Sequence, residues 1–151
     1  MKCPIFCACE KVVFDKNETA SLISVLQNVD VRVPVTPPEY ATLPKEWFIF
    51  TRWDVSDSEP GKIFEQVWQV LWPDGEKFVE HRAPLNATSE KRDDDVRQGY
   101  FQLASFPFGQ QGKMRLLTWL DFDGQRVSEI EESGFWVQHH LLPVSTEHSV
   151  A

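Results

Sequence analysis

The sequence predicts an all-β protein that forms a single antiparallel β-sandwich domain of about eight or nine strands. Three observations lead to this prediction. Short segments in which apolar and polar residues alternate follow one another along the chain, as half-buried strands require. Turn residues separate these segments at regular spacing, and no segment has the apolar period of an amphipathic helix. Composition does not separate a sandwich from a closed barrel, so a barrel is the alternative.

The first part of the chain contains a hairpin and a central strand. The segment 3–15, CPIFCACEKVVFD, is followed by polar turn residues at 15–19, and an alternating stretch then runs from Ile23 to Val33. Four prolines between positions 34 and 44 predict a crossing connection, because proline has no N–H for the ladder. The segment 46–54, EWFIFTRWD, is apolar on both parities at its start, which is typical of a strand covered on both faces.

Two further hairpins are expected in the rest of the chain. Residues 62–72 and 76–82 flank the turn Pro73-Asp74-Gly75, which has the chemistry of a tight connection. Strand character returns at 99–106 and 113–122. The dipeptide Asp123-Gly124 then marks a second hairpin, before strand-like residues at 125–132 and 135–140.

Two polar stretches are expected to lie outside the strands. The charged run from Asn86 to Gln98 predicts a solvated loop, and its three aspartates, 93–95, lack the alternating ligands and the glycine of a calcium loop. The last residues, 143–151, have no periodicity. We therefore expect a sandwich domain over 1–142 and a flexible C-terminal tail over 143–151.

Two stretches carry a resemblance to a known group of proteins. Residues 7–29 have the arrangement C-x-C-E-x-V followed by D-x-N-x-x-x-S-L-I-S-V-L-x-N-V, and residues 106–130 read FPFGQQGKMRLLTWLDFDGQRVSEI. Both are similar to a group of uncharacterised bacterial proteins that begin with a cysteine-containing strand. The resemblance implies an immunoglobulin-like β-sandwich, and it brings no catalytic residues because the function of that group is unknown. Residues 113–115, Lys-Met-Arg, stand where an aromatic-bearing strand start is commoner in the group.

Charge and composition argue against two classes of partner. With 23 acidic and 15 basic residues the formal charge is -8, so phosphate backbones and anionic lipids are repelled, and we expect neither a nucleic acid nor a membrane partner. The apolar runs are far shorter than the ~20 residues of a spanning helix, and no secretory segment follows Met1. Three cysteines, an odd number, then fit a cytoplasmic protein with reduced thiols.

All three cysteines lie in the segment CPIFCACE, residues 3–10. Their spacing, C-x₃-C-x-C, is one residue shorter than an iron–sulfur spacing, and it falls in an expected strand. There the Cα atoms of Cys7 and Cys9 would be about 6.6 Å apart, with parallel side chains. We therefore expect small buried apolar residues and no metal or cofactor, with Cys7 and Cys9 inaccessible and unbridged and Cys3 as the reachable thiol. A metal or redox site completed by His81 and His139 is the weaker alternative.

The aromatic residues carry the functional hypothesis. The chain has six Trp and eleven Phe, and most are expected in the core. Any that emerge on one face would form a patch for a partner or ligand. The candidates lie near strand ends or in a hydrophobic turn: Trp53, Trp72, Phe106, Phe108 and Trp119.

The leading hypothesis is a non-enzymatic module that acts through protein–protein contact, either as a homo-oligomer or by docking to a protein partner. A small-molecule or carbohydrate-binding domain is the alternative, and a Cys/His metal or redox protein is less favoured. The sequence has no G-x-S-x-G, H-E-x-x-H or phosphate-loop motif, so nothing in it favours an enzyme. An exposed aromatic face would favour the first hypothesis, and a concave pocket with a convergent Trp and Asp or Gln would favour the second.

Overall fold

The computed structural model describes residues 1–17, 19–58, 61–85 and 96–143. Within these residues the chain forms strands and no helix. The strands are β1 (Lys2–Phe14), β2 (Ala20–Val25), β3 (Asn28–Val33), β4 (Thr42–Asp54), β5 (Glu65–Leu71), β6 (Lys77–Pro84), β7 (Val96–Pro107), β8 (Gly112–Phe122), β9 (Gln125–Arg126) and β10 (Glu131–Leu141).

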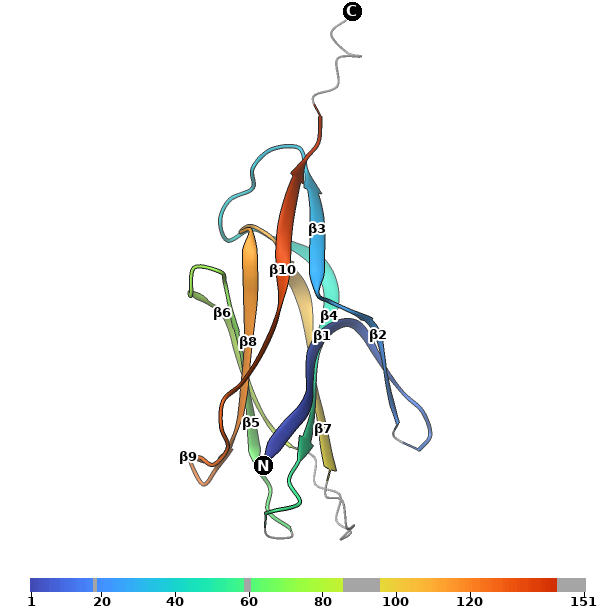
Figure 1. Ribbon diagram of the computed structural model, residues 1–151, viewed down its shortest axis with the longest axis vertical. Coiled ribbons are helices and arrows are strands. Elements are labelled where there is room, and N and C mark those ends of the chain that lie inside the picture. The colour runs from blue at the N-terminus through green and yellow to red at the C-terminus, as the bar shows by residue number, and fades with distance from the viewer. Residues whose placement is uncertain (18, 59–60, 86–95, 144–151) are drawn as a thin grey trace, which may run out of the picture.

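The strands form two sheets that lie face to face, as Figure 1 shows. The four-stranded sheet has the order β2-β1-β4-β7. The six-stranded sheet has the order β3-β10-β8-β5-β6, with the short β9 beside β8. Every pairing is antiparallel except that of β3 with β10, which is parallel. The all-β, two-sheet architecture that the sequence predicts is confirmed. No helix among the described residues is long and apolar enough to cross a membrane.

Two apolar clusters fill the space between the sheets. The larger cluster includes Trp47 and Ile49 from β4 and Trp68 from β5, and the smaller one includes Trp53 from β4 and Leu120 from β8. Both sheets therefore contribute inward-facing residues to each cluster, which is the arrangement of a sandwich core.

Three polar residues lie between the two clusters. On β4, β5 and β8, the inward-facing positions between cluster residues are occupied by Thr51, Gln66 and Thr118, all fully buried. With its amide oxygen turned toward the indoles, Gln66 accepts hydrogen bonds from Trp53 Nε1 at 3.0 Å and Trp68 Nε1 at 3.2 Å. The middle of the core is thus a hydrogen-bonded layer, which is stable only because its polar groups have partners.

The strand over 46–54 is covered on both faces, as its apolar pattern predicts. Trp47 and Ile49 face the core, while Phe48 and Phe50 face outward from β4 and are nevertheless only 7% and 2% exposed. Part of the cover on the outer side comes from the β1–β2 hairpin, which is described with the candidate site.

The alternating stretch from Ile23 to Val33 is two strands rather than one. The N–H of Leu26 donates to the Ala8 carbonyl of β1 at 2.8 Å, and the Gln27 carbonyl accepts from the N–H of Trp136 in β10 at 2.8 Å. The chain therefore leaves the four-stranded sheet and joins the six-stranded sheet at this point. This crossing is why the described residues form ten strands against the eight or nine expected.

The two turn-based hairpins form as the local sequence predicts. β5 pairs with β6 across the turn that contains Gly75, whose φ is 94°. β8 pairs with β9 across Asp123 and Gly124, which have φ values of 53° and 77°, the backbone that a two-residue hairpin turn requires. The expected strand over 125–132 is wrong in extent, because only two of its residues pair in β9 before β10 begins at Glu131.

Parts of the two stretches expected outside strands are not covered by the structure. Residues 86–95, including the three aspartates, and residues 144–151 lie outside the described residues. The end of the charged run is a strand rather than a loop: β7 begins at Val96, and Arg97 is buried, with its guanidinium 5.6 Å from the ring centroid of Phe64.

Candidate functional site

The five aromatic residues expected in a surface patch are divided between the core and the surface, and Phe108 packs against the same apolar cluster as Trp72 and Phe106. Trp72 and Phe106 are buried in the larger apolar cluster, and Trp53 is buried in the smaller one. Phe108 and Trp119 are half-buried, and they are the two that reach the surface. The expectation came from their positions near strand ends, and such a position does not determine which face of a sheet a side chain occupies. Three of the five are therefore core residues.

The cysteines are buried thiols of low acidity. All three are free. Cys9 is fully buried, as expected, whereas Cys7 and Cys3 are half-buried. Burial raises the pKa of Cys3 to about 12 and that of Cys9 to about 11, and it raises the pKa of Cys7 as well. The thiolate, which is the nucleophile and the metal ligand, is disfavoured at all three positions.

The histidines in the described residues have structural partners. His81 stacks on Phe101, with ring centroids 4.2 Å apart, and thereby joins the edges of the two sheets. His139 is hydrogen-bonded to the Phe108 carbonyl, and His140 lies 2.9 Å from Asp30. Across the described ranges no three His, Cys, Asp or Glu side chains are grouped so that they could hold a metal ion. The cysteine–histidine site is not assembled there.

The β1–β2 hairpin carries the main exposed apolar surface of the four-stranded sheet. Figure 1 shows this hairpin projecting from the side of the sandwich. We call the exposed apolar residues of the hairpin and its neighbours the hairpin surface: Ile5, Val13, Phe14, Ile23, Val25 and Tyr100. Exposed apolar residues on neighbouring strands form the kind of surface that proteins use for contact with one another.

The end of the hairpin reaches across the outer side of the sheet. β4 lies between β1 and β7, yet the ring of Phe14 at the end of β1 is only 5.5 Å from that of Tyr100 on β7. The Tyr100 ring also lies 6.3 Å from that of Phe48, an outward-facing residue of β4, so the end of β1 lies over the outer side of β4. Lys45 of β4 also contacts β1, through an ion pair of 2.8 Å with Glu10. This cover contributes to the shielding of Phe48 from solvent.

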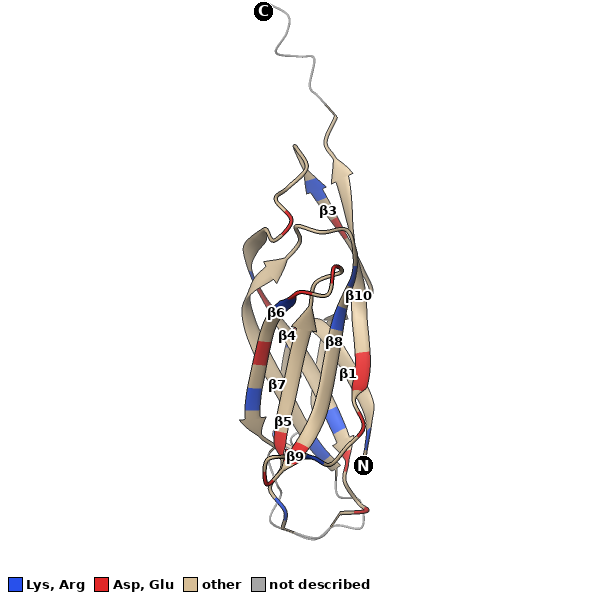
Figure 2. Cartoon of the chain, turned by 90° about the vertical axis from the view of Figure 1, so that its left-hand side faces the viewer, with Lys and Arg blue, Asp and Glu red and all other residues tan. Residues whose placement is uncertain are grey.

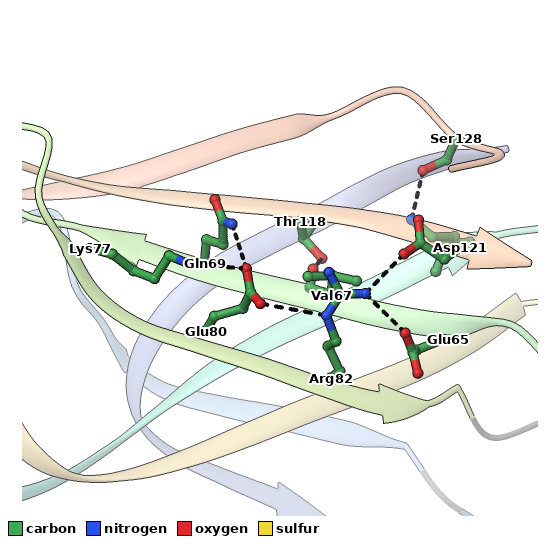
Figure 3. Close-up of polar contacts among 10 residues, drawn as sticks. Glu65, Val67, Gln69, Lys77, Glu80, Arg82, Thr118, Asp121 and Ser128 are labelled. Carbon is green, nitrogen blue, oxygen red and sulfur yellow. Dashed lines mark hydrogen bonds and ion pairs between the residues drawn. The ribbon is translucent and has the colours of Figure 1, made fainter. Parts of the chain in front are cut away.

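The outer face of the six-stranded sheet has a different character around β5 and β6, because ion pairs cover it there. Figure 3 shows Arg82 of β6 at the centre of this network. Its guanidinium lies 3.0 Å from Glu65 and 3.1 Å from Asp121, and its Nε lies 3.5 Å from Glu80. Gln69 donates to Glu80 at 2.6 Å. These side chains are mutually satisfied, so this part of the surface is closed to an apolar partner.

The free edges of the sheets differ in the same way. β3 carries Asp30 and Arg32, and β6 carries Lys77, Glu80 and Arg82 (Figure 2). Such charges protect an edge strand from pairing with another chain. β7 ends in proline and is flanked by β6 through the stacked His81–Phe101 pair.

β2 has none of these protections. Its sequence, ASLISV, contains no charged residue and no proline, and it forms the open edge of the four-stranded sheet. Ile23 and Val25 on this strand are each 46% exposed. Sequence analysis missed this edge, because its alternating pattern suggested one long strand running on to Val33. The absence of charge from 19 to 29 was the available signal.

No family model, no curated protein and no solved structure matches the chain. The description of these surfaces therefore rests on the structure alone.

Proposed function

We propose that this protein is a non-enzymatic β-sandwich module that assembles with a second copy of itself through the free edge of β2. One observation carries the proposal: β2 is an open edge strand without charge or proline, and two of its side chains form part of an exposed apolar surface. Unpaired backbone N–H and C=O groups on such a strand bind another extended strand.

A second copy of this chain offers the kind of strand that the β2 edge would bind. The partner strand must be extended and uncharged, and it must place apolar side chains beside Ile23 and Val25. β2 of another molecule meets these conditions. Its residues 20–23 are already paired with β1, and the extended backbone is interrupted only at Ser24, whose φ is 55°. Pairing of this preformed stretch costs little conformational entropy. Antiparallel pairing about a two-fold axis is self-complementary and closed. It would join the two four-stranded sheets into one.

The two-fold pairing makes position 23 sensitive to charge. Residues directly opposite each other in an antiparallel pair share a face, so an axis near the middle of β2 passes through Leu22 or Ile23. Side chain 23 then lies opposite its own copy or opposite Ser21. A lysine there would bring two like charges together in the centre of the interface, which is destabilising.

Ile23→Lys and Ile63→Lys form a matched pair for testing this proposal. Ile63 is also exposed, by 63%, but it lies outside both sheets. Each variant adds one positive charge at an isoleucine on the surface. We expect the wild type and Ile63→Lys to be dimeric in light scattering and native mass spectrometry. Ile23→Lys should weaken the dimer at least tenfold, or about 1.4 kcal/mol. A wild type that stays monomeric at all concentrations, or equal loss in both variants, would contradict self-assembly.

Salt provides an independent arm of the same test. Each copy carries a formal charge of -8, so two copies repel each other at long range while the interface itself is uncharged. Raising the ionic strength screens this repulsion. The dimer fraction should therefore rise with salt. A fall with salt would point to a partner held by ion pairs, and the β2 interface would be wrong.

We also propose that the sandwich is immunoglobulin-like, in keeping with the resemblance to uncharacterised bacterial proteins. The order β10-β8-β5 in one sheet and the β4-β7 pair in the other support it, because they correspond to the G-F-C strands and the B-E pair of that fold. A departure is β2, which extends this sheet beyond β1. The three free cysteines fit the proposed cytoplasmic location, which cell fractionation would test.

A further inference from the structure

Trp136 differs from the other tryptophans of this protein. All six lie in the described residues: four are buried in the core, Trp119 is half-buried, and Trp136 is 55% exposed. Exposing an indole forgoes a large hydrophobic stabilisation. The neighbours of Trp136 on β10 face inward, and the sheet alternation places its own ring on the outer side. The residues around the ring therefore indicate which kind of ligand it would contact.

A cleft lies beside Trp136 because β10 continues past the point where β8 begins. β8 begins at Gly112, opposite Val137, so the rest of β10 has no β8 neighbour. At this point the Gln111 side chain replaces β8 as a hydrogen-bond partner of β10. Its Oε1 accepts a hydrogen bond from the backbone N–H of His139 at 2.9 Å. The resulting cleft is about 330 Å³ and is lined by Asn28, Val29, Gln111, Gly112, Trp136, Val137 and Gln138.

The lining combines one aromatic face with amides and contains no charged residue. Asn28, Gln111 and Gln138 are exposed side chains that each have an NH₂ donor and an oxygen acceptor. The bond to His139 occupies the Gln111 oxygen and fixes the amide, so that its NH₂ group is left as the donor. This set of groups matches a ligand whose hydroxyl groups both donate and accept, and it offers no partner for a charged ligand.

We propose that this cleft binds a neutral saccharide of one or two rings. One C–H face of a sugar ring stacks on the Trp136 indole, and its hydroxyl groups exchange hydrogen bonds with the amides of Asn28, Gln111 and Gln138. The cleft volume is at the lower end of the ~300–1,000 Å³ that ligand sites span, which suits a ligand of this size. The site is on β3, β8 and β10, apart from the β2 edge, so it is independent of the proposed dimer.

The test is an NMR titration of the ¹⁵N-labelled full chain with glucose, galactose, mannose, N-acetylglucosamine, maltose and cellobiose. Each sugar is added to about 50 mM, which saturates a site whose Kd is about 1 mM. We expect at least one sugar to shift the indole N–H signal of Trp136 and the side-chain amide signals of Gln111 and Gln138. The other five indole signals should stay in place.

Variants separate the cleft from non-specific effects. Trp136→Ala should abolish the saturable shifts, and Trp136→Phe, which keeps an aromatic face, should retain weakened binding. Gln138→Ala should weaken binding several-fold, while the matched Gln102→Ala, at an exposed position of β7 in the other sheet, should not change it. Unchanged melting temperatures show that the variants are folded.

Three outcomes would overturn the proposal. No sugar shifts the Trp136 signal at about 50 mM, or Gln102→Ala weakens binding as much as Gln138→Ala does. The third outcome is that no sugar shifts these signals while an uncharged proline-rich peptide saturates them, which would make the cleft a peptide site. None of these results tests the proposed dimer, which is tested separately by the molecular mass in light scattering and native mass spectrometry.

Discussion

At the residue scale, Gln66 is the side chain on which the core depends most. It is fully buried between two apolar clusters, and its amide satisfies the indole N–H groups of Trp53 and Trp68. If β5 shifted by one residue relative to its neighbouring strands, the Gln66 amide would leave the core and Val67 or Glu65 would take its place. The polar layer thus helps to specify how the two sheets pair, as well as contributing stability.

Gln66→Leu should destabilise the protein by about 2–4 kcal/mol, because it leaves buried donors without acceptors. The measurement is urea unfolding followed by tryptophan fluorescence. Gln98→Leu is a matched control: the Oε1 atom of Gln98 is buried and has no partner among the described residues, so removing that amide loses no hydrogen bond there. A similar loss in both variants would show that shape, and not the hydrogen bonds, makes Gln66 important.

The cysteines should react slowly at neutral pH. Because burial raises the pKa of Cys3 to about 12 and that of Cys9 to about 11, little thiolate is present. With iodoacetamide at pH 8, we expect Cys3 to be alkylated at least about tenfold more slowly than a free cysteine of pKa about 8.5. Cys9 should react only after unfolding. Peptide mass spectrometry measures each site, and rapid labelling of Cys3 below pH 8 would be inconsistent with its raised pKa.

At the element scale, the β1–β2 hairpin has two roles on its two sides. Its inner side helps to shield Phe48 through the contact between Phe14 and Tyr100. Its other side and its free edge present Val13, Ile23 and Val25 of the hairpin surface. The position of the end of β1 over β4 makes both roles possible, because a hairpin that only continued the sheet would leave Phe48 more open to water.

Phe14→Ala should loosen this cover. Losing the ring contact with Tyr100 and part of the shielding of Phe48 should cost about 1–2 kcal/mol in unfolding free energy. It should also speed amide exchange in β4, which mass spectrometry after deuterium labelling detects. Val13→Ala is the control, because Val13 is equally exposed, 41% against 39%, and faces the other side of the strand. Equal effects of the two variants would mean that the hairpin does not shield β4.

At the scale of the whole molecule, the two sheets present contrasting surfaces. The six-stranded sheet has charges on its outer edges and an ion-paired network centred on Arg82. The four-stranded sheet has an uncharged open edge at β2 and exposed apolar residues beside it. The β2 edge is therefore open to association, whereas the edges of the six-stranded sheet and its Arg82 network are protected, and this contrast is the basis of the proposed self-assembly.

Folding stability should fall at both extremes of pH. Hydrogen bonds or ion pairs in the folded state lower the pKa of five carboxyl groups below their usual 3.8 or 4.5, so the stabilisation that they bring is present above those values and lost as pH falls below them. These groups are Glu10, Asp54, Asp57, Asp74 and Glu80.

Tyr40 has the opposite sign. Its hydroxyl donates to Asp74 at 2.6 Å, which raises its pKa to about 12, so its contribution is present below about pH 10 and is lost as pH rises through 12. Melting temperatures measured across pH should be flat from about pH 5 to 9 and fall outside this range. Asp74→Asn should lower the pKa of Tyr40, as tyrosinate absorbance reports, and an unchanged titration would show that the contact does not form in solution.

The sequence by itself determined that the protein is all-β, where most strands lie, and where the hairpins at Gly75 and Gly124 turn. These features follow from alternation and turn chemistry, which act between neighbours along the chain. Only the tertiary structure decided that the stretch before Val33 divides between two sheets, that β2 is an open edge, and that Trp136 is the exposed tryptophan. The reason is physical: alternation gives each strand two faces, but only packing against the other sheet determines which face is buried and which edge stays unpaired.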